Sequence, residues 1–152
     1  TEQEYDFVMD VNMKGSFFLS QAVGRHMITR KSGSQINIAS INTDRPLKFV
    51  LPYAATKAAM NHMTRSLAME WGPHGVRVNA IAPSLTRSNM ASPLLSNSAS
   101  ADSIAGMHPL PRLGEPSDMA ALATFLLSDD ASWMTGQIVG VDGGRSVLRV
   151  KS

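Results

Sequence analysis

The sequence predicts an α/β fold in which helices cover a parallel sheet. Helix-like and strand-like patterns alternate along the chain, in the order helix, strand, helix, strand, lid, helix, strand. Alternation of this kind produces right-handed crossovers between parallel strands. Ligands of such sheets bind beyond the carboxyl ends of the strands, so polar side chains that follow the strands are the first candidates for a site.

The chain opens on a helix signal. Thr1 and Glu4 have the spacing of a capping box, and apolar residues recur at helical intervals over residues 7–27. This pattern predicts a long helix over residues 1–30, and an interruption near residues 12–15 stays open. A chain that starts at a helix cap, with no strand before it, indicates a cut domain.

The middle of the chain predicts two strands and a second long helix. Residues 35–40 alternate and carry β-branched side chains, and residues 76–82 form a second run of this kind, which Pro83 stops. Residues 41–52 contain two prolines and are expected to form a loop, whereas residues 53–71 carry apolar faces typical of a helix.

The last part of the chain predicts a lid, a third helix and a third strand. Residues 84–112 are rich in Ser, Asn, Pro and Met and have too little periodicity to predict a helix, which is typical of a functional lid or of disorder. A helix is expected over residues 115–128, with Pro116 near its first position. The third strand covers residues 135–141, and the short basic tail 145–152 is expected to fray.

Composition excludes several kinds of site. The 152 residues include no cysteine, so disulfides, thiolate metal sites and a cysteine nucleophile are excluded. The formal charge of +2 comes from scattered bases, unlike a nucleic-acid footprint, and no apolar run reaches the roughly 18 residues of a membrane span. The four histidines lack metal-site spacing and are expected on the surface or in the lid, where His108 is a candidate to line a substrate pocket. We therefore expect no metal, nucleic acid or membrane partner, and a cytoplasmic location because the composition fits a reducing compartment.

Tyr53 and Lys57 share one face of the second helix, because they are four residues apart. The ammonium of Lys57 then favours the phenolate form of Tyr53, so that the phenol can exchange a proton with a substrate oxygen. Ser40 ends the first predicted strand and Asn12 lies on the first helix. Each residue taken singly also fits an ordinary role: a serine at a strand end, an asparagine at a helix irregularity, and a tyrosine packed on the lid.

Six motifs occur together along nearly the whole chain. They are Val11-Asn12-x-x-Gly15, Ile36-Asn37-Ile38-Ala39-Ser40, Tyr53-Ala54-Ala55-Thr56-Lys57-Ala58-Ala59, Val76-Arg77-Val78-Asn79-Ala80-Ile81-Ala82-Pro83, Pro111-Arg112-Leu113-Gly114-Glu115-Pro116, and Thr135-Gly136-Gln137 to Val141-Asp142-Gly143-Gly144. In order and spacing they resemble the carboxyl-terminal part of a classical short-chain dehydrogenase/reductase. The resemblance implies an incomplete Rossmann-like, doubly wound parallel sheet with three strands, three main helices and a lid, as a single partial domain over residues 1–152.

The resemblance also implies an NAD(P)-dependent oxidoreductase that transfers hydride between a nicotinamide cofactor and a small-molecule carbonyl or secondary alcohol. Tyr53 would be its general acid/base, and Lys57 would tune the phenol and hold the nicotinamide ribose. Ser40 would hydrogen-bond the substrate oxygen, and Asn12 would hold a water that relays protons from Lys57. Two hydroxyls aimed at one oxygen would stabilise the charge that hydride transfer builds there.

Cofactor contacts are implied directly after the second strand. The family usually has Pro-Gly there, whereas this chain has Pro83-Ser84, which loses the close backbone approach that glycine allows. The backbone of Thr86 and the hydroxyl of Ser88 would face the nicotinamide amide, with ordinary lid polarity as the alternative. The family's Gly-rich pyrophosphate loop and its residue that selects NAD or NADP have no counterpart in these 152 residues, which leaves a site for the nicotinamide end.

An alternative hypothesis is a truncated, catalytically silent fragment that acts as an oligomerising or binding module. Without preceding strands, the edge of strand 35–40 and the apolar faces of the helices are bare, and surfaces of this kind recruit partners. In the family the first two long helices commonly form a dimer interface. Under either hypothesis we expect a homo-oligomer, a dimer or a tetramer.

Overall fold

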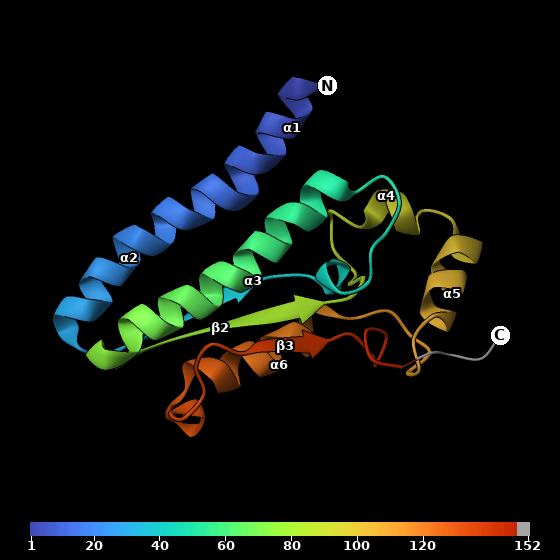
Figure 1. Ribbon diagram of the computed structural model, residues 1–152. Coiled ribbons are helices and arrows are strands. Elements are labelled where there is room, and N and C mark those ends of the chain that lie inside the picture. The colour runs from blue at the N-terminus through green and yellow to red at the C-terminus, as the bar shows by residue number, and fades with distance from the viewer. Residues whose placement is uncertain (149–152) are drawn as a thin grey trace.

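The computed structural model describes residues 1–148, which form a three-stranded parallel sheet with helices packed against it (Figure 1). The sheet consists of β1 (Gly33–Ile38), β2 (Val76–Pro83) and β3 (Ile138–Val141) in the spatial order β1-β2-β3. Parallel pairing places Ile38 opposite Ile81 and Pro83 opposite Val141. All three strands therefore end at the same edge, as the alternation in the sequence predicts.

One continuous helical rod precedes the sheet (Figure 1). It consists of α1 (Glu2–Met9), the π-helical segment η1 (Asp10–Gly15) and α2 (Ser16–Arg30). The predicted capping box is present: the hydroxyl of Thr1 accepts from the backbone N–H of Glu4, and the Glu4 carboxylate bonds back to Thr1. The predicted interruption near residues 12–15 is confirmed, because η1 covers them with wider turns. Such π segments in helices are frequent at functional sites.

The central strand β2 is buried on both faces, and its side chains alternate between two helical layers. Val76 and Val78 pack with Trp71 near the end of α3 (Leu51–Trp71), and Met27 of α2 joins this cluster. Ile81 points to the opposite face and packs with Leu126 of α6 (Pro116–Leu127). This alternation shows helices on both faces, the arrangement that a parallel sheet requires.

Some predicted boundaries differ from the structure. α3 starts two residues earlier than predicted, because Pro52 is well suited to the first turn of a helix. β3 is shorter than the predicted strand 135–141, since Gly136 adopts a left-handed turn (φ 71°) before the strand begins. The short 3₁₀ turns are η2 (Ile41–Thr43), η3 (Gly72–His74) and η4 (Asp129–Ala131). Residues 149–152 of the predicted frayed tail lie outside the described residues.

The lid 84–112 is partly helical, although its sequence has too little periodicity to predict a helix. It contains α4 (Ser92–Leu95) and α5 (Ser98–Gly106), and the side chain of Asn97 caps α5 by accepting from the N–H of Ala99. α5 buries none of its side chains. A helix without a buried face carries no apolar stripe, so periodicity could not reveal it. None of the helices among residues 1–148 combines the length and apolar character needed to cross a membrane.

The contact between α2 and α3 depends on Gly24, because a Cβ at this position would overlap the ring of the buried Trp71. We expect Gly24→Ala to lower the free energy of unfolding by about 1 kcal/mol, since overpacking costs more than the gain in helix propensity. Urea denaturation of the purified protein measures this change. Gly72→Ala is the matched control, because Gly72 has helical dihedral angles and no atom within 4 Å of its Cβ position. Equal stability of the two variants would contradict the packing argument.

Candidate active site

Asn12 is hydrogen-bonded to the first turns of α3. Its Nδ2 donates to Oγ1 of Thr56 at 3.2 Å, and this hydroxyl donates to the backbone carbonyl of Tyr53 at 2.7 Å. Thr56 is fully buried, so the two bonds form a protected connection between η1 and α3. Thr56 was given no role by sequence reasoning. The sequence feature that could have drawn attention to Thr56 is its position between Tyr53 and Lys57. Its hydrogen bond to Asn12 could not be predicted, because the two residues are 44 positions apart in the sequence.

Lys57 lies between Tyr53 and the end of β1. Its Nζ donates to the carbonyl of Ile38 at 2.7 Å and lies 5.7 Å from the centre of the Tyr53 ring. Burial lowers the pKa of the Lys57 ammonium, because desolvation penalises its charged form. The structure therefore brings the two residues together at the carboxyl end of β1, with a cation close to the phenol.

Ser40 is buried and caps the 3₁₀ turn η2, where its Oγ accepts from the backbone N–H of Asn42 at 3.1 Å. Its carbonyl accepts from the hydroxyl of Thr43, which in turn accepts from Nδ2 of Asn61 on α3. β1 ends at Ile38, so Ser40 lies two residues beyond the strand that it was predicted to end, and its own hydroxyl proton is left to donate. Among residues 1–148 it makes no hydrogen bond to Tyr53 or Lys57.

Ser84 follows Pro83, the last residue of β2, and contacts the lid. Its Oγ lies 2.7 Å from Nε2 of His108, whose Nδ1 lies 2.9 Å from the carbonyl of Ile104. A carbonyl only accepts, so Nδ1 is a donor to it, and the tautomer with its one proton on Nδ1 leaves Nε2 as an acceptor for the hydroxyl of Ser84. His108 is buried within the lid, one of the two locations expected for the histidines.

A cavity of about 480 Å³ lies beside this contact and is lined by Ser84, His108, Asp142, Gly143 and Gly144 among others. His108 therefore lines a pocket, as the sequence suggested. The remaining histidines are exposed: His26, His62 and His74. Within residues 1–148 no group of three or more His, Asp or Glu side chains is placed to hold a metal ion.

Thr86 and Ser88 use their hydroxyls within their own segment. Oγ1 of Thr86 donates to the carbonyl of Ser84 at 3.0 Å, and Oγ of Ser88 accepts from the N–H of Ala91 at 3.3 Å. Thr86 also pairs with Gly114 in an isolated parallel bridge. These contacts order the chain after β2, and they leave the predicted nicotinamide contacts as predictions.

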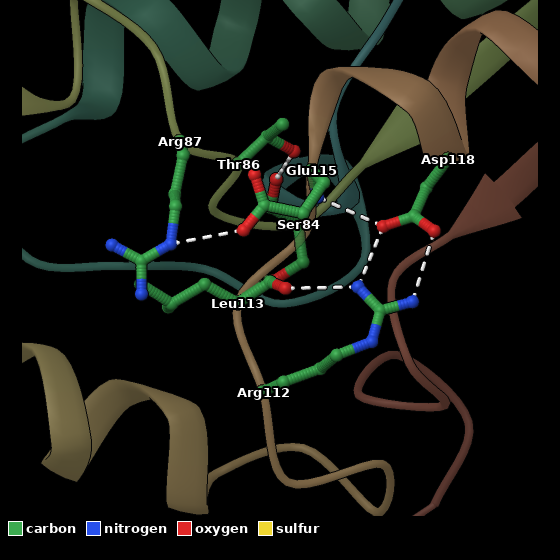
Figure 2. A network of polar contacts seen from close by, with 7 residues as sticks. All are labelled: Ser84, Thr86, Arg87, Arg112, Leu113, Glu115 and Asp118. Atoms are coloured by element: carbon green, nitrogen blue, oxygen red, sulfur yellow. Dashed lines mark hydrogen bonds and ion pairs between the residues drawn. The ribbon is translucent and has the colours of Figure 1, made fainter.

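Two ion pairs close the base of the lid, and we call them the lid neck (Figure 2). Arg87 pairs with Glu115 at 3.0 Å, and Arg112 makes a bidentate pair with Asp118 at 2.6 and 2.9 Å. One oxygen of Asp118 also accepts from the N–H of Glu115 and so caps α6. In the sequence, residues 111–116 served only as one of the six motifs. The pairing of Arg87 with Glu115 could not be predicted from their spacing.

Taken together, the edge of the sheet presents a phenol, an ammonium and a hydroxyl, from Tyr53, Lys57 and Ser40. All three can donate a proton or a hydrogen bond to an oxygen of a ligand. Lys57 spends one of its three hydrogens on the carbonyl of Ile38, which leaves two for the hydroxyls of a ribose. This set of donors is suited to the oxygen atoms of a hydroxyl-bearing ligand.

Comparison with known proteins identifies similar chains. A sequence model of the family described as enoyl-(acyl carrier protein) reductase matches residues 1–146. A galactitol 2-dehydrogenase (L-tagatose-forming) from Cereibacter sphaeroides is 42% identical over 143 residues, which cover 92% of this chain and 56% of that protein. The 5-keto-D-gluconate 5-reductase of Escherichia coli strain K12 is 36% identical over 146 residues, which cover 96% of this chain and 58% of that protein.

Solved structures give the same result. A gluconate 5-dehydrogenase from Burkholderia cenocepacia J2315, solved in complex with NADP and tartrate, superposes with a TM-score of 0.94 at 32% identity. The match covers 97% of this chain and 58% of that structure. The chain thus spans a little over half the length of the relatives it matches.

The ion pair of Arg112 with Asp118 predicts a pH dependence of stability. Hydrogen bonds from Arg112 lower the pKa of Asp118 from 3.8 to about 2. Because the pKa of Asp118 is lower in the folded protein than in the unfolded chain, its carboxylate stabilises the fold fully at any pH above the ordinary pKa of 3.8. This contribution is lost as the pH falls from about 4 through about 2. Thermal unfolding of the wild type and Asp118→Asn between pH 7 and pH 2 should therefore show a difference that shrinks in this window. Asp102→Asn on α5 is the control, and a difference independent of pH would exclude the ion pair as its source.

Proposed function

Because the chain belongs to the short-chain dehydrogenase/reductase family, we propose that it transfers hydride between NAD or NADP and the carbonyl or secondary alcohol carbon of a small polyhydroxy compound. The names of its relatives, galactitol 2-dehydrogenase and 5-keto-D-gluconate 5-reductase, support this class of substrate. The observation that carries the proposal is the placement of Lys57 between the carbonyl of Ile38 and the ring of Tyr53.

Tyr53 is the proposed general acid/base. In the oxidising direction its phenolate takes the proton of the substrate hydroxyl as the carbinol hydride leaves, and in the reducing direction its phenol returns that proton to the carbonyl oxygen. The nicotinamide accepts or supplies the hydride. The ammonium of Lys57 stabilises the phenolate through its charge, which acts strongly because the group is partly buried.

Ser40 and Asn12 have supporting roles in this proposal. The buried hydroxyl of Ser40 donates to the substrate oxygen, because its Oγ accepts from the N–H of Asn42 through one lone pair and keeps its proton to donate. The Nδ2 of Asn12 is fixed by Thr56, which leaves Oδ1 of Asn12 to hold a water between Lys57 and solvent. Pro83, Ser84, Thr86 and Ser88 would hold the nicotinamide, and the cavity that Ser84 lines supports this placement for Ser84.

Tyr53→Phe tests the proposed acid/base. We expect kcat for a polyol or sugar acid to fall by about a hundredfold or more, since a positioned proton donor contributes roughly this factor. Affinity for NADH, measured by fluorescence titration, should change little because the ring remains. Tyr5→Phe on α1 is a matched control, as Tyr5 is the second tyrosine of the chain and is 49% exposed. An unchanged kcat for Tyr53→Phe would remove Tyr53 from this role.

Self-association is a second proposal, and it also covers the alternative of a catalytically silent module. Large apolar side chains remain exposed along the rod, including Phe7 at 68% and Leu19 at 66%, and a groove of about 610 Å³ lies between α2 and α3. Burial of this surface in a dimer or tetramer is favourable, because it removes apolar area from water.

Sedimentation and cofactor titration separate self-association from catalysis. We expect Leu19→Glu to shift the sedimenting species towards the monomer, whereas Glu2→Gln at the polar start of α1 should not. Binding of NADH at micromolar concentration by the wild type would exclude a silent module. A monomeric wild type would contradict the self-association proposal.

A further inference from the structure

Two arginines, one from the segment after each edge strand, come together near the carboxyl end of the central strand. Arg45 follows β1 and Arg145 follows β3, whereas Ser84 follows β2, which lies between those strands. The Nη1 of Arg145 lies 3.4 Å from Oγ of Ser84. Arg45 reaches across to the chain after β3, where its Nε donates to the carbonyl of Ser146 at 3.2 Å. Both guanidiniums therefore lie at the edge where ligands of parallel sheets bind.

The two arginines meet at the same turn, because Arg45 donates to the carbonyl of Ser146, the residue that follows Arg145. Burial lowers the pKa of Arg145, and the positive charge of Arg45 lowers it further. Both side chains are half-buried, and among residues 1–148 neither forms an ion pair with a carboxylate. Two half-buried cations at one place destabilise the fold unless an anion offsets their charge.

Asp142 is the acid whose charge acts on Arg145, and it offsets only part of the positive charge. Its Oδ1 accepts from the N–H of Gly144 at 2.9 Å, and its Oδ2 accepts from the N–H of Ser146 at 2.8 Å. These backbone donors hold the carboxylate in the turn after β3. One excess positive charge therefore remains at the edge, with guanidinium hydrogens left over for an acceptor.

We propose that Arg145 and Arg45 form a carboxylate subsite, which makes a polyhydroxy acid, rather than a neutral polyol, the preferred substrate. This inference rests on the proposed function and specifies its substrate class. A guanidinium binds a carboxylate through two parallel hydrogen bonds. Arg145 carries most of the interaction, because its contacts to Oγ of Ser84 and Sδ of Met107 are long, at 3.4 Å each, whereas Arg45 donates to the carbonyls of Ser146 and Leu148 at 3.2 Å.

Ser84 adds a second element of recognition. With Nε2 of His108 as the acceptor of its proton, Ser84 has two lone pairs, and one of them accepts from Nη1 of Arg145. A substrate hydroxyl can donate to such an oxygen, whereas a carbonyl cannot. The subsite thus presents a cationic position for a carboxylate next to an acceptor for a hydroxyl, the pattern of groups on adjacent carbons of a sugar acid.

Two matched pairs of compounds test the inference: galactonate with galactitol, and gluconate with sorbitol. The members of each pair differ in charge at one end and not in carbon number. We expect the wild type to have the higher kcat/KM for the acids. Arg145→Met should lower kcat/KM for the acids by about tenfold to a hundredfold, the loss of a charge-assisted hydrogen bond, and leave the polyols nearly unchanged. Arg145→Lys should restore part of the loss, since it keeps the charge without the bidentate geometry.

Arg65→Met is the matched control, because Arg65 is an exposed arginine on α3. Calorimetric binding of gluconate and sorbitol, with cofactor present, supplies a readout that does not require turnover. Equal preference for acids and polyols, or acid binding that Arg145→Met leaves intact, overturns the subsite and leaves the proposed function standing. Loss of gluconate binding in Arg145→Met with no turnover of any compound supports the subsite while the proposed function fails. A raised KM for NAD(P) with unchanged preference for acids assigns the arginines to a cofactor phosphate and overturns the inference.

Discussion

β2 hydrogen-bonds to β1 along one side and to β3 along the other, and both pairings are parallel. This constraint decides where chemistry can occur, because parallel strands deliver all their carboxyl ends to one edge. Ser40, Ser84 and Asp142 come from segments more than 40 residues apart in sequence and meet there for this reason alone. The burial of Val76, Val78 and Ile81 on the two faces of β2 fixes the register, since a shift by one residue would exchange the two faces.

The helices packed on the sheet help to orient the candidate catalytic side chains at this edge. Asn12 on η1 and Asn61 on α3 are buried or half-buried amides, and each holds a hydroxyl that supports a candidate catalytic residue: Thr56 for Tyr53, and Thr43 for Ser40. Buried polar networks restrict side chains to one arrangement when their members are satisfied. The amide nitrogen of Asn61 is satisfied by Thr43, whereas its Oδ1 has no hydrogen-bond partner among residues 1–148. The wider turn of η1 brings Asn12 into the network without breaking the rod.

Local patterns were sufficient for most of the fold and for part of the candidate site. Alternation of β-branched residues predicted β1 and β2, the capping box predicted the start of α1, and the four-residue spacing predicted that Tyr53 and Lys57 share a face. Long-range contacts could not be predicted in this way. The hydrogen bond of His108 with Ser84 and the pairing of Arg87 with Glu115 depend on how the lid folds back, which no local periodicity encodes. α5 was missed for the opposite reason, since its surface has no buried face to produce a pattern.

The lid neck lets the lid vary separately from the sheet and the residues at its edge. The bridge of Thr86 with Gly114 and the two ion pairs close the lid into a loop whose ends are fixed, so the chain inside it can change with little effect on the sheet. Loop closure is insensitive to length, because each doubling of a loop costs only about 0.6 kcal/mol. Insertions or exchanges between α4 and α5 can therefore change the lid while Ser40, Tyr53 and Lys57 keep their positions at the edge of the sheet. Such a division lets the lid diverge in sequence without a new search for a stable fold.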